Sequence, residues 1–255
     1  MKKKILLNFR NRGYEKIDKV FSENEILQIN ISLFDNIQIL LKKKIYKKFS
    51  INNLQKLIVY TYFKKPKIFS KFYDLCQNYI GLYQLCTNKK LIDIVSKLLK
   101  VNKNSLLVGD LTLRLDNPGK SAAALDFHQE STYYPEIKNY DKSILIWLPL
   151  HDIDKNGGGL AVCNKFFSKK YKTKWTRGQP RLNKNSKILK KLKANFIFEG
   201  KLGSILACNF NSFHASTINK SLNFRLSCAL RFYSSESHDF KPFRKFRKSM
   251  VGLYS

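Results

Sequence analysis

Residues 111–116 read LTLRLD, a run in which leucines alternate with a threonine, an arginine and an aspartate. Successive side chains of a β-strand point to opposite faces of the sheet, so this alternation predicts a strand with one apolar and one polar face. Three later segments are also rich in β-forming residues: 144–150, 204–210 and 224–232. The chain is therefore predicted to be built from strands after residue 105.

The residues before this point follow a helical period. Residues 22–25, SENE, form a capping box, in which the serine accepts from the third backbone N–H of the helix and the glutamate reaches back. Apolar residues follow on one helical face at positions 26, 29, 33, 37 and 40. Further helices are predicted over residues 69–79 and 88–100.

Together the two halves predict a single domain, mainly β with α, over residues 1–255. A helical layer over residues 1–105 precedes an antiparallel sandwich or jelly roll over residues 106–235, and residues 236–255 form a basic tail. The sequences DNPG (116–119) and NGGG (156–159) predict turns.

Composition sets limits on the class of protein. Hydrophobic residues make up 44% of the 255 residues, which is enough for a sizeable core. No apolar run approaches the roughly 20 residues needed to cross a bilayer, and the apolar part of the opening MKKKILL is too short for a signal peptide. The five cysteines are scattered without a CxxC pair, so we interpret them as reduced core residues. We expect a soluble cytoplasmic protein in a reducing compartment.

The formal net charge of +30 is typical of proteins that bind nucleic acid or membrane surfaces. However, 39 of the 48 basic residues are lysines spread over nearly the whole chain, and asparagine and isoleucine are also abundant, as in AT-rich genomes. We therefore interpret the lysines as a solvated surface. The lysine-rich stretch 165–193 is interpreted as a long insertion loop that could cover one end of the sandwich.

The sequence DFHQE at residues 126–130 contains one of only four histidines. In a strand, His128 and Glu130 would project from the same face while Gln129 points away. A third ligand from another strand would complete the face of two histidines and one carboxylate that leaves three positions open on Fe(II). The candidate is His214. A histidine and a glutamate at this spacing are a weak signal alone, and the remaining histidines, 151 and 238, are interpreted as surface residues.

The neighbourhood of His214 strengthens this hypothesis. Arg225 follows His214 by eleven positions, after the turn-like residues 219–221. A hairpin of this length can bring Arg225 beside the metal, where its guanidinium group could hold a ligand carboxylate. Ser227 shares the face of Arg225 and could donate a further hydrogen bond.

With these motifs in view, the sequence resembles the phytanoyl-CoA dioxygenase family of Fe(II)- and 2-oxoglutarate-dependent oxygenases. The resemblance covers nearly the whole chain. The segments that carry it are GYEKIDKVFSENEI (13–26), residues 91–115, DFHQE (126–130), ILIWLPLHDIDKNGGGLAV (144–162) and HASTINKSLNFR (214–225).

The resemblance implies a double-stranded β-helix, which is a cupin-like jelly roll, and a site in which each motif has a role. The iron ligands would be His128, Glu130 and His214. Arg225 would hold the distal carboxylate of 2-oxoglutarate, and Trp147 and Gln129 would lie near the cosubstrate pocket. The implied activity is hydroxylation by O2, with release of succinate and CO2 from 2-oxoglutarate.

The sequence departs from the family pattern at three places. The usual carboxylate ligand is aspartate, and here it is the longer Glu130; a halogenase would carry no carboxylate there, so that branch is disfavoured. The proline-glycine-serine-histidine segment that often follows the glycine-rich turn is replaced by VCNK at residues 162–165. Ser204 stands where an aspartate is common, which we interpret as a structural change at the start of a strand.

Three residues are candidates for contact with the substrate. Arg114 is expected to face the pocket, because a charged side chain in an otherwise apolar strand needs a partner. Tyr133 and Tyr134 follow the predicted ligand pair, and for both tyrosines core packing is an equal alternative. Lipid acyl thioesters, amino-acid derivatives, sugars and natural-product intermediates are all open as substrates.

Two other functions compete with a small-molecule oxygenase. A nucleic-acid dealkylase would use the same iron chemistry and a basic groove beside His128, which evenly spread lysines do not favour. A basic binding protein without iron chemistry would use the tail KPFRKFRKSMVGLYS (241–255) on an acidic surface. The predicted iron ligands and Arg225 argue against that second alternative.

Overall fold

The computed structural model describes residues 3–119, 126–134, 140–163, 169–176, 179–182, 187–188, 192–194 and 196–236. The helices are α1 (Lys3–Arg12), α2 (Glu23–Leu41), α3 (Ile51–Lys64), α4 (Pro66–Cys76), α5 (Ile80–Cys86) and α6 (Lys89–Leu99). The strands are β1 (Tyr14–Ile17), β2 (Leu106–Asp116), β3 (Ser143–Pro149), β4 (Leu160–Val162), β5 (Thr173–Thr176), β6 (Gln179–Leu182), β7 (Phe196–Phe198), β8 (Ile205–Asn209), β9 (His214–Ser216) and β10 (Arg225–Ser234).

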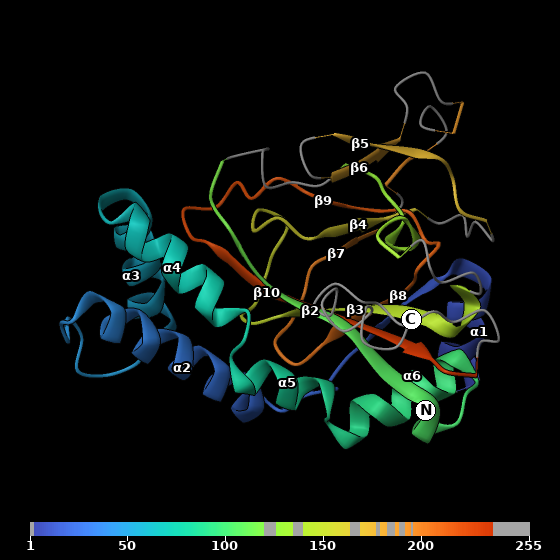
Figure 1. The fold of residues 1–255 in the computed structure, drawn as a ribbon, viewed down its shortest axis with the longest axis horizontal. Helices are drawn as coiled ribbons and strands as arrows, with labels where there is room; N and C mark the ends of the chain where they lie inside the picture. Colours follow the sequence, from blue (N-terminus) through green and yellow to red (C-terminus); the bar gives the residue numbers. More distant parts are fainter. Residues whose placement is uncertain are drawn as a thin grey trace, which may run out of the picture.

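The strands form antiparallel sheets of different size. The major sheet has the order β1-β8-β3-β10-β2, and the minor sheet has the order β7-β4-β9. Every pairing within these two sheets is antiparallel. Figure 1 shows the minor sheet on one side of the major sheet and the helices on its other side and at one end. The architecture is therefore mixed, with a layer of helices, a large sheet and a small sheet.

The alternation in β2 explains how the helical layer attaches to the major sheet. Leu111, Leu113 and Leu115 belong to the core that the helices share with the sheet. Thr112 and Arg114, between them, line a cavity on the opposite face. The expected strand with two distinct faces is confirmed, and its polar face turns toward the minor sheet, with Arg114 facing the cavity as expected.

Strand β3 is apolar from Ile144 onward because both of its faces are covered. Ile144, Ile146 and Leu148 pack in the core with the helices, whereas Leu145 and Trp147 pack with residues of the minor sheet. All seven residues of this strand are buried. The continuous apolar run in the sequence is thus the signature of a central strand between two layers.

The predicted helix starts are largely confirmed. The capping box at the start of α2 is complete: the Glu25 N–H donates to Ser22 Oγ at 3.2 Å, and the Ser22 N–H donates to a Glu25 carboxylate oxygen at 2.7 Å. Helix α6 begins after Asn88, as expected. Helix α4 begins at Pro66, three residues earlier than predicted, because proline is favoured in the first helical turn.

Two glutamines connect the helical layer to the backbone of the major sheet. Gln55 of α3 donates to the Phe224 carbonyl at 2.8 Å and accepts from the Phe224 N–H at 2.9 Å. Gln77 forms the same pair of bonds with Leu113, at 3.1 and 2.9 Å. Because Phe224 precedes β10 directly, Gln55 fixes the point at which the strand carrying Arg225 begins.

The structure also bears on the expectations for residues 165–193 and for the cysteines. The stretch 165–193 was expected to be a loop, but it contains the hairpin β5-β6. The five cysteines are buried and unbridged, as expected. Within the described residues, no helix is long and apolar enough to span a bilayer. His238 and residues 241–255 lie outside the part of the chain that the structure describes.

Candidate metal centre

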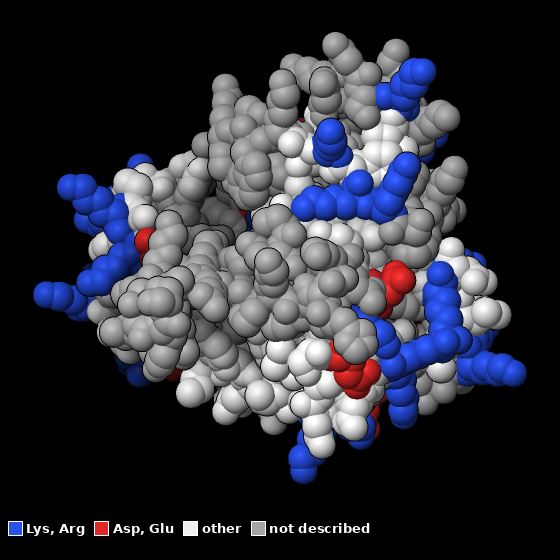
Figure 2. Space-filling model, turned by 45° about the vertical axis from the view of Figure 1, so that its right-hand side comes forward, with Lys and Arg blue, Asp and Glu red and all other residues white. Residues whose placement is uncertain are grey.

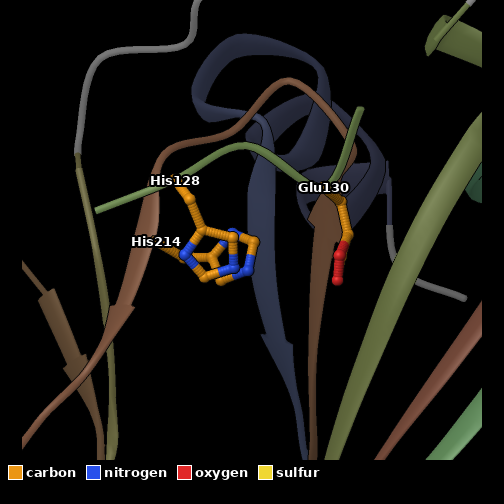
Figure 3. Close-up of side chains that lie close together, drawn as sticks. All are labelled: His128, Glu130 and His214. Atoms are coloured by element: carbon orange, nitrogen blue, oxygen red, sulfur yellow. The ribbon is translucent and has the colours of Figure 1, made fainter. Parts of the chain in front are cut away.

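The three predicted iron ligands come together in the structure. His128, Glu130 and His214 each offer a ligand atom, and these atoms all lie within 4.8 Å of one another. All three side chains are buried. Figure 3 shows the two imidazole rings lying against each other, with the Glu130 carboxylate extending on the same side from the adjoining turn.

The two histidines are direct backbone partners. The His128 N–H donates to the His214 carbonyl at 3.0 Å, and the His214 N–H donates to the His128 carbonyl at 3.1 Å. Their ring centroids are 4.4 Å apart. This isolated backbone bridge places His128 beside His214 at the edge of β9. The imidazole rings of two residues far apart in sequence therefore become neighbours.

The backbone route to Glu130 differs from the prediction. Residues 126–130 were expected to form a strand, but only His128 makes a bridge, and Glu130 begins a 3-10 helix over Glu130–Thr132. The turn is closed because the Thr132 N–H and Oγ1 both donate to the Gln129 carbonyl, at 3.1 and 2.6 Å. The glutamate therefore reaches the histidines by a turn of the chain and not by strand alternation.

Hydrogen bonds fix which ring nitrogens of the histidines are available. Nδ1 of His128 lies 2.7 Å from the Asp126 carbonyl, and Nδ1 of His214 lies 3.1 Å from the Ser212 carbonyl. A carbonyl oxygen only accepts, so each Nδ1 carries the proton. The Nε2 lone pair of each ring is then left for a metal, which is the usual arrangement of metal-binding histidines.

The two oxygens of Glu130 have different environments. Oε1 accepts from Nε of Arg231 at 3.0 Å and from Nη2 of Arg231 at 2.8 Å. Oε2 is buried and has no hydrogen-bond partner among the described residues. A buried polar atom without a partner is costly, so Oε2 has the environment expected of an oxygen that binds a cation.

The protonation states of the triad suit a divalent metal. Burial lowers the pKa of His128 to about 3, and burial also lowers the pKa of His214, so both rings are neutral. Burial, the largest single influence, would raise the pKa of Glu130, but the charge and hydrogen bonds of Arg231 together with the two neighbouring histidines outweigh it, and the pKa is lowered. The donor set is therefore two neutral imidazoles and one carboxylate, which matches the ligand type of non-heme iron sites.

The triad faces a cavity between the two sheets. β2 contributes Thr112 and Arg114, β3 contributes Leu145 and Trp147, and β10 contributes Arg225, Ala229 and Arg231. The minor sheet contributes Leu160, His214 and Ser216. Of the predicted site residues, Arg114, Trp147 and Arg225 thus line the same cavity as the metal ligands.

Arg225 is buried in an ion pair with Asp116. Its Nε donates to Asp116 Oδ2 at 3.1 Å, and its Nη2 donates to the same oxygen. Its Nη1 donates to the carbonyls of Gly158 and Gly159. Gly158 has a φ of +80°, and a Cβ there would lie 2.9 Å from the backbone of Asn219, which accounts for a glycine beside this arginine.

Asp116 is shared by two arginines. Its Oδ1 accepts from Nη2 of Arg114 at 2.6 Å, while Oδ2 serves Arg225. The guanidinium group of Arg225 also lies over the Trp147 ring, with 5.7 Å between the guanidinium carbon and the ring centroid. Two of the predicted pocket residues are therefore joined through a carboxylate that sequence reasoning did not identify.

The remaining predicted residues lie at varying places around the site. Ser227 is fully buried, and its Oγ has no hydrogen-bond partner among the described residues. Tyr133 contacts the His128 ring edge-on, with centroids 5.7 Å apart. Tyr134 packs against Phe210 in the core between the sheets. Neither tyrosine is among the described residues that line the cavity.

Gln129 and His151 have partners in the protein backbone. The Gln129 amide donates to the carbonyls of Lys169 and Asn211, at 3.0 and 2.8 Å, and accepts from the Tyr171 N–H at 2.9 Å. It connects backbone segments and is not among the cavity-lining residues. His151, expected at the surface, is half-buried, and its Nε2 accepts from the Leu226 N–H at 3.2 Å.

Sequence reasoning missed Arg231 and Asp116. Arg231 lies six positions after Arg225 on the same strand, so the two share a face. The signal was present, because an arginine within an apolar strand requires a buried partner, which is the argument that selected Arg114. Asp116 was read as part of a turn, and its role as a carboxylate between two arginines depends on strand register.

The fold is shared with solved non-heme enzymes that depend on 2-oxoglutarate. The epimerase SnoN, solved with Fe3+, α-ketoglutarate and nogalamycin RO, is 10% identical with a TM-score of 0.61; the match covers 91% of this chain and 83% of SnoN. EvdO2 from Micromonospora carbonacea var. aurantiaca, solved with 2-oxoglutarate, is 13% identical with a TM-score of 0.60 and coverages of 92% and 91%.

A third solved structure of this fold is EctD from S. alaskensis with 2-oxoglutarate and 5-hydroxyectoine. It is 14% identical with a TM-score of 0.63, and the match covers 95% of this chain and 79% of EctD. No protein-family model and no curated protein sequence matches the chain. At these identities the likeness establishes a common fold, while the chemistry has to be argued from the residues of the site.

Proposed function

We propose that the protein is an Fe(II)- and 2-oxoglutarate-dependent oxygenase that hydroxylates a small-molecule metabolite. We further propose that its two sheets form a double-stranded β-helix of the phytanoyl-CoA dioxygenase type. The observation that carries the proposal is the buried triad of His128, Glu130 and His214, whose ligand atoms lie within 4.8 Å of one another. Neighbours of the same fold were solved with Fe3+ and with 2-oxoglutarate.

The donor atoms of this chain fit Fe(II). Both histidines have Nδ1 against a backbone carbonyl, which leaves Nε2 for the metal. Glu130 presents one buried oxygen without a partner among the described residues. Two histidines and one carboxylate leave three positions of an octahedral ion open, enough for a chelating cosubstrate and O2.

Bound iron and 2-oxoglutarate would supply the oxidation, in which O2 is consumed and 2-oxoglutarate is converted to succinate and CO2. Arg225 would hold the distal carboxylate of the cosubstrate, and Ser227 would donate to it through a hydroxyl that has no partner among the described residues. Trp147, packed beneath the Arg225 guanidinium group, would form an apolar wall of the same pocket.

Because Asp116 already engages two nitrogens of Arg225, the arginine would share its charge between Asp116 and the cosubstrate. Asp116 would also orient Arg225 before the cosubstrate arrives. Gln129 would affect the cosubstrate pocket indirectly, by holding together the backbone segments that contain Lys169 and Asn211.

Two features support a small substrate. The cavity lies between the sheets, and the apolar residues Leu145, Trp147, Leu160 and Ala229 line it together with the triad, two hydroxyls and three arginines. Arg114 lines this cavity and would contact the substrate, with Tyr133 and Tyr134 placed behind the ligands. Small-molecule sites combine apolar walls with a few convergent polar groups that fix the orientation of the ligand.

The test is anaerobic titration of the purified protein with Fe(II), followed by 2-oxoglutarate. We expect one Fe(II) per chain and a weak visible charge-transfer band when the cosubstrate chelates it. His214→Ala should lose the band, whereas the matched control His151→Ala, which changes a histidine outside the triad, should keep it. A wild-type protein that is folded by circular dichroism and still fails to bind Fe(II) would overturn the proposal.

The substrate would be sought by measuring succinate formation against fractionated metabolite pools. A fraction that raises succinate release in the wild-type protein and not in His214→Ala contains a substrate. Mass spectrometry of that fraction should show a product heavier by one oxygen atom. A product of unchanged or lower mass would show that the oxidative reaction is one other than hydroxylation.

A further inference from the structure

We infer that Arg231 is a positioning residue, which holds Glu130 as a one-oxygen ligand and so keeps one metal position open for O2. The inference deepens the function proposed above and rests on it. It begins with an asymmetry: one oxygen of Glu130 is bound to a guanidinium group, and the other has no partner among the described residues.

Both hydrogen bonds from Arg231 end on the same carboxylate oxygen. Nε and Nη2 donate to Oε1 at 3.0 and 2.8 Å. An oxygen of this kind has two lone pairs in the carboxylate plane, and two N–H donors use both of them. Oε1 is therefore withdrawn from metal binding, and Oε2 is the oxygen left to bind.

The arginine is itself held in place. Nη1 of Arg231 donates to Thr112 Oγ1 at 3.0 Å, on the neighbouring strand β2. The regular β2-β10 register extends to Arg231 and shifts only between Arg231 and Phe232. From this position the Arg231 side chain crosses from the sheet to the turn that carries Glu130.

Glutamate needs such a restraint. It has one more rotatable bond than aspartate, so its carboxylate can swing more easily to place both oxygens on one metal ion. With two histidines and two carboxylate oxygens bound, an octahedral ion keeps two open positions. A cosubstrate that chelates through two atoms would fill both, and O2 would have none. The contact between Arg231 and Glu130 prevents this by occupying Oε1.

Arg231→Gln tests the inference because it removes the charge and the two-pronged donor together. The probe is nitric oxide, which binds an open Fe(II) position and gives an electron paramagnetic resonance signal. We expect the nitric oxide affinity of the Fe(II)- and 2-oxoglutarate-loaded variant to fall by about 10- to 100-fold, the range typical for residues that orient metal ligands. Metal affinity without cosubstrate should be retained or increase, because a positive charge is removed and a second oxygen is released.

Two further variants make the result specific. Arg231→Lys keeps the positive charge but lacks the paired N–H donors of the guanidinium group, so its nitric oxide affinity should lie between those of wild type and Arg231→Gln. If Arg231→Gln does not fold, Arg231→Lys provides the test in its place. Thr112→Val removes the hydrogen bond between Arg231 and β2 and leaves both bonds to Glu130, so its effect should be smaller than that of either arginine variant.

The outcomes separate the two proposals. If the wild-type protein binds no Fe(II), the proposed function fails, and this inference fails with it. If wild type loads normally and Arg231→Gln binds nitric oxide as wild type does, the function stands and the positioning role is wrong. If Arg231→Gln loses metal affinity and melting temperature together, Arg231 has a purely structural role, which also overturns the inference.

Discussion

Arg225 and Asp116 are directly opposite each other in the pairing of β10 with β2, and their side chains form an ion pair that is almost fully buried, with exposed fractions of 2% and 8%. Arg225 lines the same cavity as the metal ligands. A buried arginine with an internal carboxylate can serve stability, cosubstrate binding or both, and mutation separates these roles.

Arg225→Ala should weaken 2-oxoglutarate binding by on the order of 2 to 5 kcal/mol, because a charge-assisted pair is lost. It should also lower the unfolding free energy by about 1 to 3 kcal/mol, because Asp116 loses one of its two arginine partners. Fe(II) affinity without cosubstrate should stay nearly unchanged, since Arg225 is not a ligand. Anaerobic 2-oxoglutarate titration and a thermal melt measure the two effects.

Two companion variants define the controls for Arg225. Lysine at this position should recover only part of the cosubstrate affinity, because a point charge cannot reproduce the planar set of donors by which the guanidinium group binds Asp116 and a second acceptor together. Asp116→Asn keeps an acceptor for Arg225, so it should retain cosubstrate binding while lowering the melting temperature. Unchanged 2-oxoglutarate affinity in Arg225→Ala would remove Arg225 from the site and leave the ion pair as its role.

Gln129→Ala should behave as a structural variant. Its amide makes three hydrogen bonds with backbone groups of Lys169, Asn211 and Tyr171, so their loss should cost about 1 to 3 kcal/mol of unfolding free energy. The dissociation constant of 2-oxoglutarate from the Fe(II)-loaded protein should change much less than in Arg225→Ala. A large loss of cosubstrate affinity at unchanged melting temperature would instead place Gln129 in direct contact with the cosubstrate.

The cysteines should not react with thiol reagents in the folded protein. Burial raises the pKa of Cys76 and Cys86 to about 12 and of Cys163 to about 11, and it raises the pKa of Cys208 and Cys228 further. A raised pKa leaves the thiol protonated at pH 8, and the thiolate is the reactive form. A chromogenic disulfide should therefore titrate none of them at pH 8 before denaturation and all five afterwards; rapid reaction in the native state would contradict the packing described here.

The basic surface should contribute little to specificity. Figure 2 shows Lys and Arg side chains on several separate parts of the visible face, with Asp and Glu among them. Nucleic-acid affinity should accordingly be weak, steeply salt-dependent and without sequence preference, and turnover of a neutral substrate should change little with salt. Filter binding at physiological salt is the measurement, and a nanomolar, lesion-selective complex would favour the nucleic-acid dealkylase.

Local patterns predicted much of the fold because they reflect rules that act within a few residues. The capping box at Ser22 and the alternating leucines of β2 are sufficient by themselves to define a helix start and a two-faced strand. Short strands such as β4 and β9 are only three residues long, and they are held by pairing with distant segments. No local pattern marks them, so they were not predicted.

The same distinction applies to the site. The metal triad was predicted from residue types and spacing, and the structure brings it together, but by a bridge and a turn where a strand was expected. Asp116 was missed because its role depends on the pairing of β2 with β10. Arg231 carried a local signal as an arginine in an apolar strand, but its partner Glu130 lies on a turn distant in sequence. Register and long-range pairing are not visible in a single strand.

The backbone bridge between His128 and His214 ties metal binding to completion of the fold. These residues are separated by most of the β-sheet region, and their rings meet only when β9 has docked and the preceding segment has paired with it. A nascent or partly unfolded chain would present an isolated histidine at one place and a histidine with a glutamate at another. Such a chain would hold a metal ion poorly, so the complete set of three ligands would form only after the minor sheet has closed.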